Sequence, residues 1–159
     1  MALEIGVGTG VVTEKMASRN FYTIGVDIDW NAILETKKRL TNLSLLDKVD
    51  LICCDGGAPF REGVFELIAF NPPYLPSNEI IDNTIDGGEE GISVIESILD
   101  NTLCLIRRDG RMLLLISSFS NYEEFMHNLR KKGYEPTIKK QEHIFFEDIY
   151  LIEVMVKRY

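Results

Sequence analysis

The sequence predicts an α/β fold with a mostly parallel sheet, helices on both faces and an antiparallel hairpin at the C-terminal end. Short apolar segments alternate along the chain with segments whose apolar residues recur every three or four positions. This alternation of strand and helix is typical of a parallel sheet covered on both faces. The last two strand segments, 136–140 and 149–156, lie close in sequence and can pair as an antiparallel hairpin at one sheet edge.

The length and composition indicate one soluble globular domain. A chain of 159 residues is long enough to bury a core, and we expect residues 1–159 to form a single domain. No apolar run approaches the roughly 20 residues that span a bilayer, and the first residues lack the basic start and apolar stretch of a signal peptide. We therefore expect a cytoplasmic protein without a membrane association.

The charge balance is acidic, with 17 basic and 25 acidic residues and a net charge of −8. Such a surface repels a phosphate backbone, which disfavours a nucleic-acid partner. The three cysteines, Cys53, Cys54 and Cys104, lack the C-x-x-C spacing of zinc or redox sites. We expect no metal site and interpret these cysteines as buried free thiols.

The N-terminal half alternates regularly between the two kinds of element. We expect strands at 2–5, 21–26, 49–54 and 65–70, a helix at 11–18 and a second helix after Asp29. Asp29 is placed to cap that second helix, because Asp is a preferred residue before the first helical turn. The side chains expected on the buried side of this helix are Ile33, Leu34, Lys37 and Leu40.

A segment without periodicity, 75–90, opens the C-terminal half. Proline, glycine and acidic residues interrupt it, so we expect a long loop, and loops of that length commonly carry function. Apolar residues spaced by three and four across 92–106 then predict a helix. The dipeptide Asp-Gly at 109–110 is expected to turn the chain into a strand at 112–116.

The last helix has a start and a stop signal. Ser120 and Glu123 have the spacing of a capping box, in which each side chain satisfies a backbone N–H of the first turn. Its apolar face is expected to contain Phe125, Met126 and Leu129, and Gly133 is expected to end it.

A glycine-rich turn joins the first predicted strand to the first helix. The motif begins at Glu4 and places glycines at Gly6, Gly8 and Gly10. Strand, glycine turn and helix hold a nucleotide at the switch point of an open α/β sheet. A dinucleotide fingerprint would need a glycine or alanine at position 11, where this chain has Val11. The spacing instead resembles the first motif of class I S-adenosylmethionine methyltransferases, whose glycines let the backbone approach the methionine moiety.

Acidic residues follow the predicted strands. Asp27 ends the second strand, and a carboxylate there can accept hydrogen bonds from both ribose hydroxyls. Asp29 is the competing candidate for ribose binding, although its position before the second helix favours a role as a helix cap. The resemblance implies that Asp55 contacts the adenine amino group; the alternative is a solvated acid at a strand end. It also implies that Glu4 faces the cofactor's ammonium group, whereas the alternative is that Glu4 only braces the glycine loop.

The tetrapeptide Asn71-Pro72-Pro73-Tyr74 directly follows the strand at 65–70, where α/β sheets place ligands. The lone pair of an amide or aminopurine nitrogen is delocalised, so such a nitrogen is a poor nucleophile. If the Asn71 side-chain oxygen and the Pro72 carbonyl each accept one N–H, the NH₂ group is held in one orientation for attack on a methyl. The prolines stiffen the turn, and Tyr74 offers a flat face for stacking.

These motifs resemble the HemK-type protein glutamine methyltransferases, which modify the Gly-Gly-Gln loop of translation release factors, over essentially the whole chain. The stretch Asp-Gly-Gly-Glu-Glu-Gly at 86–91 also looks like that family's loop after Asn-Pro-Pro-Tyr. The resemblance implies a Rossmann-like class I methyltransferase fold, S-adenosylmethionine as cofactor, and the side-chain amide nitrogen of a glutamine as methyl acceptor. The expected protein substrate is a translation release factor.

The residues expected at the site form two groups. Those expected to bind the cofactor are Glu4, Gly6, Gly8, Gly10, Asp27, Ile28, Asp55, Gly56 and Asn71. Those expected to bind the substrate are Asn71, Pro72, Pro73 and Tyr74, and of these we expect Asn71, Pro72 and Tyr74 to act in catalysis.

Two departures from the family pattern bear on these expectations. The family has a segment upstream of the first strand, with a Tyr-x-Pro-x-Glu-Asp-like stretch that helps cover cofactor and substrate, whereas Met1 lies almost at the strand itself. We therefore expect either a truncated start or a site that lacks one part. The large helical domain of the bacterial members is absent as well. The chain thus resembles the short archaeal and eukaryotic branch, whose members often work with a small zinc-binding activator subunit.

Two other functions stay open. An N6-adenine methyltransferase of DNA or RNA shares the Asn-Pro-Pro-Tyr chemistry, but it must flip its base and needs a basic groove or a recognition domain. A non-catalytic cofactor-binding subunit that stabilises a partner is compatible with a missing N-terminal segment. The sequence alone leaves the acceptor, the activator and the oligomeric state undecided.

Overall fold

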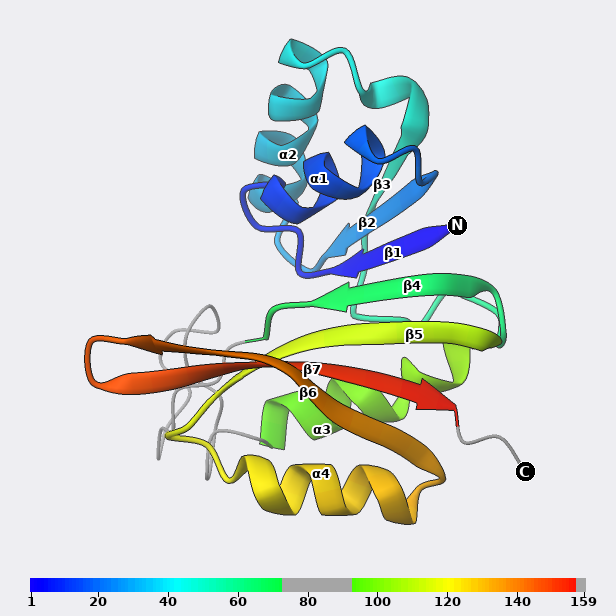
Figure 1. Cartoon of the computed structure of the whole chain (residues 1–159). Helices are drawn as coiled ribbons and strands as arrows, with labels where there is room; N and C mark the ends of the chain where they lie inside the picture. Colours follow the sequence, from blue (N-terminus) through cyan, green and yellow to red (C-terminus); the bar gives the residue numbers. More distant parts are fainter. Residues whose placement is uncertain (73–92, 157–159) are drawn as a thin grey trace.

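The strands line up in a sheet whose spatial order differs from their order in the chain. The computed structural model describes residues 1–72 and 93–156. Within these ranges a seven-stranded sheet has the order β3-β2-β1-β4-β5-β7-β6 (Figure 1). The strands are β1 Ala2–Ile5, β2 Thr23–Asp27, β3 Val49–Cys53, β4 Phe65–Phe70, β5 Ile106–Ser117, β6 Tyr134–Ile144 and β7 Glu147–Val156. The helices are α1 Val11–Ser18, α2 Trp30–Asn42, α3 Ser93–Asp100 and α4 Tyr122–Lys131, with 3₁₀ turns η1 Leu46–Lys48 and η3 Leu103–Leu105.

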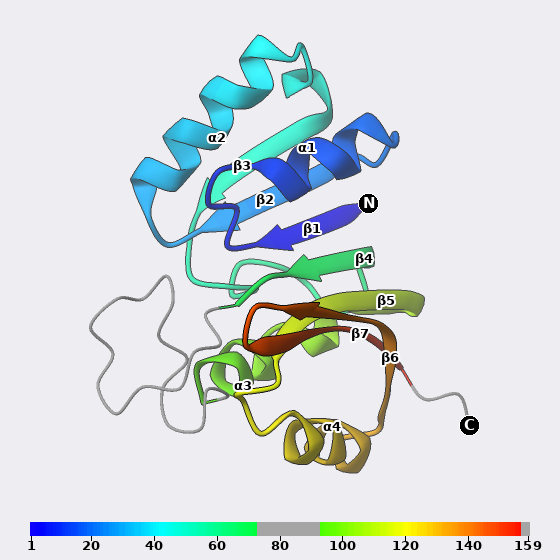
Figure 2. The same cartoon turned by 60° about the vertical axis from the view of Figure 1, so that its left-hand side comes forward.

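Helices cover both faces of this sheet. Strands β1 to β5 are mutually parallel. From β1 the chain proceeds across the sheet to β3, and from β4 it proceeds in the opposite direction to β5. Right-handed crossovers therefore place α1 and α2 on one face and α3 and α4 on the other (Figure 1 and Figure 2). The predicted fold class is confirmed.

The predicted C-terminal hairpin is confirmed too, and it is longer than expected. β6 and β7 pair antiparallel from Tyr134↔Val156 to Ile144↔Glu147. β7 also pairs antiparallel with β5, so β7 lies inside the sheet and β6 forms its edge. The hairpin thereby adds two strands to a sheet that is otherwise parallel.

The main core lies between the central strands and the helices α3 and α4. Phe65, Ile68 and Met112 from the sheet are fully buried, and they belong to one cluster with Leu99 of α3 and Phe125 of α4. Burial of side chains of this size stabilises the fold by about 1.5–3 kcal/mol each. Smaller clusters pack under α1 and α2, one of which contains Ala17, Leu40 and Val49.

The prediction of one helix across 92–106 is wrong in its C-terminal part. α3 ends at Asp100, a 3₁₀ turn covers Leu103–Leu105, and β5 begins at Ile106. Leu103, Leu105 and Ile106 are buried in the turn and at the start of the strand, so the apolar spacing continues there without a helix. The expected turn at 109–110 lies within β5, where the pairing with β4 shifts register.

Two local predictions about helices also need correction. The N-cap of α4 is Asn121, whose side chain accepts the N–H of Glu124, and Ser120 is buried just before it. The capping residue and the residue whose N–H it accepts are three positions apart, as predicted, but both lie one residue later than Ser120 and Glu123. On α2, Leu34 is 46% exposed and Lys37 is exposed too, while Thr36 is fully buried because it faces the glycine loop.

The cysteines are free thiols, as predicted, but they are not buried: Cys53 and Cys104 are exposed and Cys54 is partly exposed. Cys53 closes β3, where the strand leaves the sheet, which explains its exposure. In the described ranges, no helix combines the length and apolar character needed to cross a membrane.

Gly110 permits the irregular pairing of β4 and β5, and its replacement tests this contact. A Cβ at position 110 would lie 2.6 Å from the carbonyl oxygen of Phe65 and 3.0 Å from that of Glu66. Gly110→Ala should therefore lower the free energy of unfolding by about 1–3 kcal/mol in urea titrations. The control Asp109→Ala, at an exposed neighbour, should change it by only about 0.5 kcal/mol. Equal stability of the two variants would contradict a close approach at Gly110.

Candidate functional site

Several loops meet at the carboxyl edge of the sheet. Ile5 at the end of β1 pairs with Val26 of β2 and with Phe70 of β4, and Asp27 pairs with Cys53 of β3. The residues that follow these strands therefore emerge at the same level. The connections after β1 and β4 lead to opposite faces, so this edge contains the switch point at which open α/β sheets bind ligands.

The glycine loop packs against α2 at one of its glycines and has open space beside the other two. Gly6, Gly8 and Gly10 have positive φ angles of 71°, 48° and 77°, which favour glycine. A Cβ on Gly10 would lie 2.8 Å from Cγ2 of Thr36, whose hydroxyl donates to the Gly8 carbonyl at 3.1 Å. A Cβ on Gly6 or Gly8 would meet no atom within 4 Å. The loop can thus accept a ligand directly against its backbone.

The carboxylate of Asp27 links this loop to β2. Its Oδ2 accepts the N–H of Gly8 at 3.1 Å, and its Oδ1 accepts the N–H of Asp29 at 2.9 Å. A carboxylate has about four acceptor positions, so two N–H bonds orient Asp27 and leave room for ligand hydroxyls. The competing candidate, Asp29, caps α2 by accepting the N–H of Asn31 at 2.9 Å. The prediction that Asp29 is a helix cap is confirmed.

Glu4 is an acid inside the core. Its side chain is on a residue that is only 5% exposed, and it accepts a hydrogen bond from the hydroxyl of Thr13 on α1. Burial, opposed by this hydrogen bond and by one from the Thr13 backbone and reinforced by the charge of Asp27, raises the pKa of Glu4 to about 7. Glu4 therefore joins β1 to α1, and a cation bound beside it would favour its charged form.

The turns after β2 and β3 hold three further candidates. Ile28 is 71% exposed, Asp55 is exposed, and Gly56 has a φ of 50°. The Cys54 N–H donates to the Asp27 carbonyl at 3.0 Å and so ties the two turns together. An exposed apolar side chain and an exposed acid on adjacent turns suit the flat face and the amino edge of a purine.

Asn71 arrives at the same edge on β4. It is exposed, and it lies between the buried residues Phe70 and Pro72. Because Phe70 pairs with Ile5, the structure brings Asn71 and Pro72 beside the glycine loop. Outside the described residues lie the remaining expected substrate contacts, Pro73 and Tyr74, and the segment 86–91.

Two threonines support the site and were missed from the sequence. Thr13 donates to Glu4, and Thr36 donates to the Gly8 carbonyl. A signal for Thr36 exists, because it lies three residues after Ile33 and four before Leu40, both of which are buried. Polar residues on the buried side of a helix need a hydrogen-bond partner, and here the partner is the site itself.

The charges around the glycine loop distinguish among ligands. Glu4, Asp27 and Asp55 are all acids, and such a set disfavours a pyrophosphate while it suits hydroxyl and ammonium groups. These residues therefore fit the S-adenosylmethionine predicted from the sequence. In the parts of the chain that the structure describes, no cluster of three or more His, Cys, Asp and Glu side chains could hold a metal ion.

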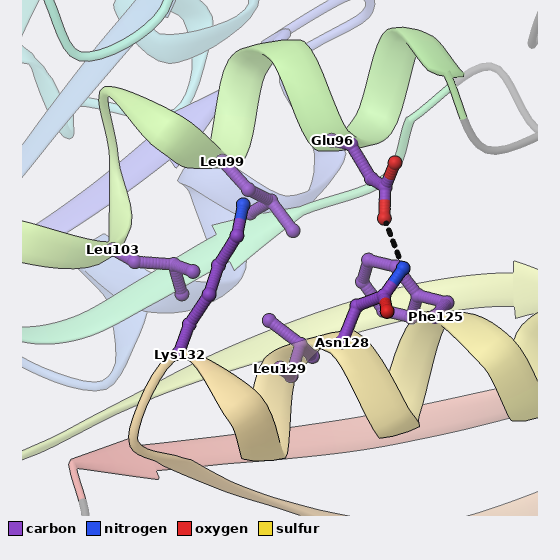
Figure 3. Close-up of a pocket in the computed structure, with 7 residues that line it drawn as sticks. All are labelled: Glu96, Leu99, Leu103, Phe125, Asn128, Leu129 and Lys132. Carbon is purple, nitrogen blue, oxygen red and sulfur yellow. Dashed lines mark hydrogen bonds between the residues drawn. The ribbon is translucent and has the colours of Figure 1, made fainter.

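A separate cavity lies between α3 and α4, on the face of the sheet that these helices cover (Figure 3). The space between its walls, including the part that is open to solvent, is about 200 Å³. The Asn128 side-chain amide donates to Glu96 across it at 3.1 Å. Its lining is mostly apolar: Glu96, Leu99, Leu103, Phe125, Asn128, Leu129 and Lys132. None of the predicted site residues lines this cavity.

Comparisons with known proteins identify the family of the chain. Residues 2–82 match a family model described as a methyltransferase domain. The chain is 29% identical, over 94% of its length and 78% of the relative's, to a protein of Methanocaldococcus jannaschii named as a protein N5-glutamine methyltransferase. It is 26% identical to the release factor glutamine methyltransferase of Caulobacter vibrioides, of which it spans only 42%.

A solved structure shares the fold over nearly the whole chain. The E. cuniculi Mtq2–Trm112 complex, described as responsible for the methylation of the translation termination factor eRF1, superposes with a TM-score of 0.80. The sequences are 24% identical, and the match covers 98% of this chain and 84% of the other.

The buried carboxyl of Glu4 should make the stability of the fold depend on pH. Between about pH 4.5 and 7 the unfolded chain releases the Glu4 proton while the folded chain keeps it, so the unfolding free energy falls as the pH rises, by about 3 kcal/mol. Glu4→Gln should lose this slope in urea titrations from pH 4 to 8. Glu35→Gln, on an exposed position of α2, should retain it. The same slope in wild type and Glu4→Gln would show that Glu4 is charged throughout.

Proposed function

Because the chain belongs to the methyltransferase domain family, whose model matches residues 2–82, we propose that it methylates a glutamine side chain of a translation release factor. The methyl donor in this proposal is S-adenosylmethionine, and the acceptor is the amide nitrogen of the glutamine in a Gly-Gly-Gln loop. The observation that carries the proposal is the position of Asn71 and Pro72, at the end of β4 beside the bare glycine loop.

In this proposal the cofactor lies along the ends of β1, β2 and β3. When bound, S-adenosylmethionine supplies an electrophilic methyl group on a sulfonium centre. Asp27 accepts hydrogen bonds from the ribose hydroxyls, in addition to those it takes from Gly8 and Asp29. Asp55 and Ile28 contact the adenine ring. Glu4 is buried behind the loop, and its ionised carboxylate stabilises the positively charged end of the ligand.

Asn71 and Pro72 orient the acceptor amide. The Asn71 side-chain oxygen and the Pro72 carbonyl each accept one N–H of the planar NH₂ group, which directs its lone pair towards the methyl. The buried Pro72 gives this turn a fixed φ, so Asn71 is held without a large entropy cost. After transfer the nitrogen loses its extra proton to water. Positioning and electrostatics are sufficient for this reaction.

A protein acceptor is supported by charge and by the relatives. The net charge of −8 disfavours binding to a polyanion, and a flipped base would need phosphate contacts beside the pocket. The relatives in M. jannaschii and C. vibrioides are named for methylation of a glutamine, the second of them in a release factor. A glutamine flanked by glycines can also extend into a narrow site, because glycine adds no side-chain bulk.

The proposal includes a partner and a place of action. The E. cuniculi relative was solved as a complex with Trm112, so we expect a small, zinc-binding activator subunit to assist this chain as well. Release factors act on ribosomes, which places the reaction in the cytoplasm. Measured activity with and without such a subunit would show whether this chain needs one.

Binding and turnover should separate when Asp27 and Asn71 are replaced. Asp27→Ala should weaken cofactor binding by about 1.5–3 kcal/mol, the range for a hydrogen bond to a charged group. Asn71→Ala should reduce methyl transfer by about 100-fold or more and leave cofactor affinity within a few-fold. Calorimetry with the demethylated cofactor measures the first effect, and labelled methyl transfer measures the second. The control Asp29→Asn keeps the cap of α2 and should leave both unchanged.

Mass spectrometry of a treated release factor tests the acceptor. Incubation with the enzyme, S-adenosylmethionine and the activator should add one methyl group to the glutamine of the Gly-Gly-Gln loop. A parallel reaction with DNA and RNA at physiological salt should give no product. Methylated adenine without a methylated factor would overturn the proposal in favour of the adenine-specific class.

A further inference from the structure

The turn between β6 and β7 exposes two aromatic rings. Phe145 and Phe146 form this two-residue turn, and they are 87% and 90% exposed. These are the largest exposures among the large apolar residues of the described ranges. Each ring has about 150–250 Å² of surface that burial would remove from water.

The turn also has an unfavourable local conformation. Phe145 has a φ of 55°, in the left-handed region that glycine and asparagine adopt at much lower cost than a bulky residue. Among the described residues the rings gain little packing that would offset this cost, since they are 87% and 90% exposed. A sequence that breaks a local rule in this way points to a role outside the folding of the hairpin.

The base of the hairpin is anchored to the end of β5. The Ser117 hydroxyl donates to Glu147, and the Ser118 N–H donates to the Asp148 carbonyl at 2.8 Å. The Asp148 N–H in turn donates to the Ser118 hydroxyl at 2.9 Å. These bonds hold the turn in a defined position, so little ordering entropy would be lost when the rings are buried.

The turn lies at the same edge of the sheet as Asn71. The last pair between β5 and β7 is Ser117↔Ile149, whereas β6 and β7 continue to Ile144↔Glu147. The hairpin therefore extends beyond the carboxyl end of β5, the strand that neighbours β4. Figure 1 shows its turn projecting past the arrowhead of β4, in the direction in which β4 delivers Asn71.

The charges around the rings are acidic. Glu142, Glu147 and Asp148 flank the turn, while His143 pairs with Asp148 at 3.0 Å and Lys140 pairs with Glu142. Acidic groups beside exposed rings disfavour a phosphate backbone or an anionic membrane, and they suit a surface with basic groups around an apolar patch.

We propose that Phe145 and Phe146 are the docking tip for the protein substrate, inserting into an apolar patch with a basic rim while the acceptor side chain reaches Asn71. This inference rests on the proposed function, because it assumes a protein acceptor. A second copy of this chain is a weaker candidate for the occupant. Two rings bury roughly 300–500 Å², below the roughly 800 Å² per partner of a stable interface, and a second copy would bring the same acidic turn and a net charge of −8 to the contact.

The test replaces the rings with the residues that the turn geometry prefers. Phe145→Gly with Phe146→Asn suits a turn with a positive φ at its first position, so the variant should melt at or above the temperature of the wild type. With a release factor as substrate, KM should rise about tenfold or more, because buried aromatic anchors dominate such interfaces. The kcat at saturation and the affinity for the cofactor should stay unchanged.

Two controls make the result specific. Leu43→Ala removes a 47% exposed apolar side chain at the C-terminal end of α2, far from the turn between β6 and β7. This variant should leave KM unchanged. Sedimentation should show the same oligomeric state for the wild type and the hairpin variant. A variant that loses a dimer would assign the rings to a second copy and overturn the inference.

The remaining outcomes separate this inference from the proposed function. A wild-type enzyme that methylates the factor, with an equal KM for the hairpin variant, overturns the docking tip alone. A lower kcat at unchanged KM also overturns it, because the rings would then act on the reaction and not on docking. A wild-type enzyme that leaves the factor unmethylated overturns the proposed function, and the docking tip falls with it.

Discussion

The pairing of β1 on both of its edges is the constraint on which the site depends. Ile5 lies opposite Val26 on one side and Phe70 on the other, so the glycine loop, Asp27 and Asn71 emerge together. A shift of β4 by one residue would turn Asn71 towards the opposite face, because side chains alternate along a strand. The buried apolar residues of β4 oppose such a shift, and the core thereby sets the geometry of the site.

Glu4 shows that this geometry has a cost. An acid at the centre of the sheet is destabilising when it is charged, and hydrogen bonds from the side chain and backbone of Thr13 compensate for only part of the penalty. A leucine or glutamine at this position would suit the core better. The fold is therefore less stable when Glu4 is charged, and this titratable acid lies directly behind the glycine loop.

Much of this fold could be predicted from the sequence, because local signals and tertiary contacts agree in the N-terminal half. β1, α1 and β4 have the predicted bounds, and Asp29 caps α2 as predicted. Prediction failed where apolar spacing had two explanations, as in the 3₁₀ turn Leu103–Leu105, which continues the pattern of α3. It also failed for Thr13 and Thr36, since their importance arises from contacts with residues distant in the sequence.

The sheet consists of two halves that meet where β1 pairs with β4, and this division bears on how the protein can change its acceptor. The candidates from Glu4 to Ile28 lie in β1 and β2 or after them, in the half that contains β1 to β3, whereas the hairpin belongs to the other half. Substitutions in the turn between β6 and β7 touch neither the glycine loop nor the strands beside it. In the proposed docking role, this turn can therefore change with the acceptor protein while the glycine loop and the strands beside it stay the same.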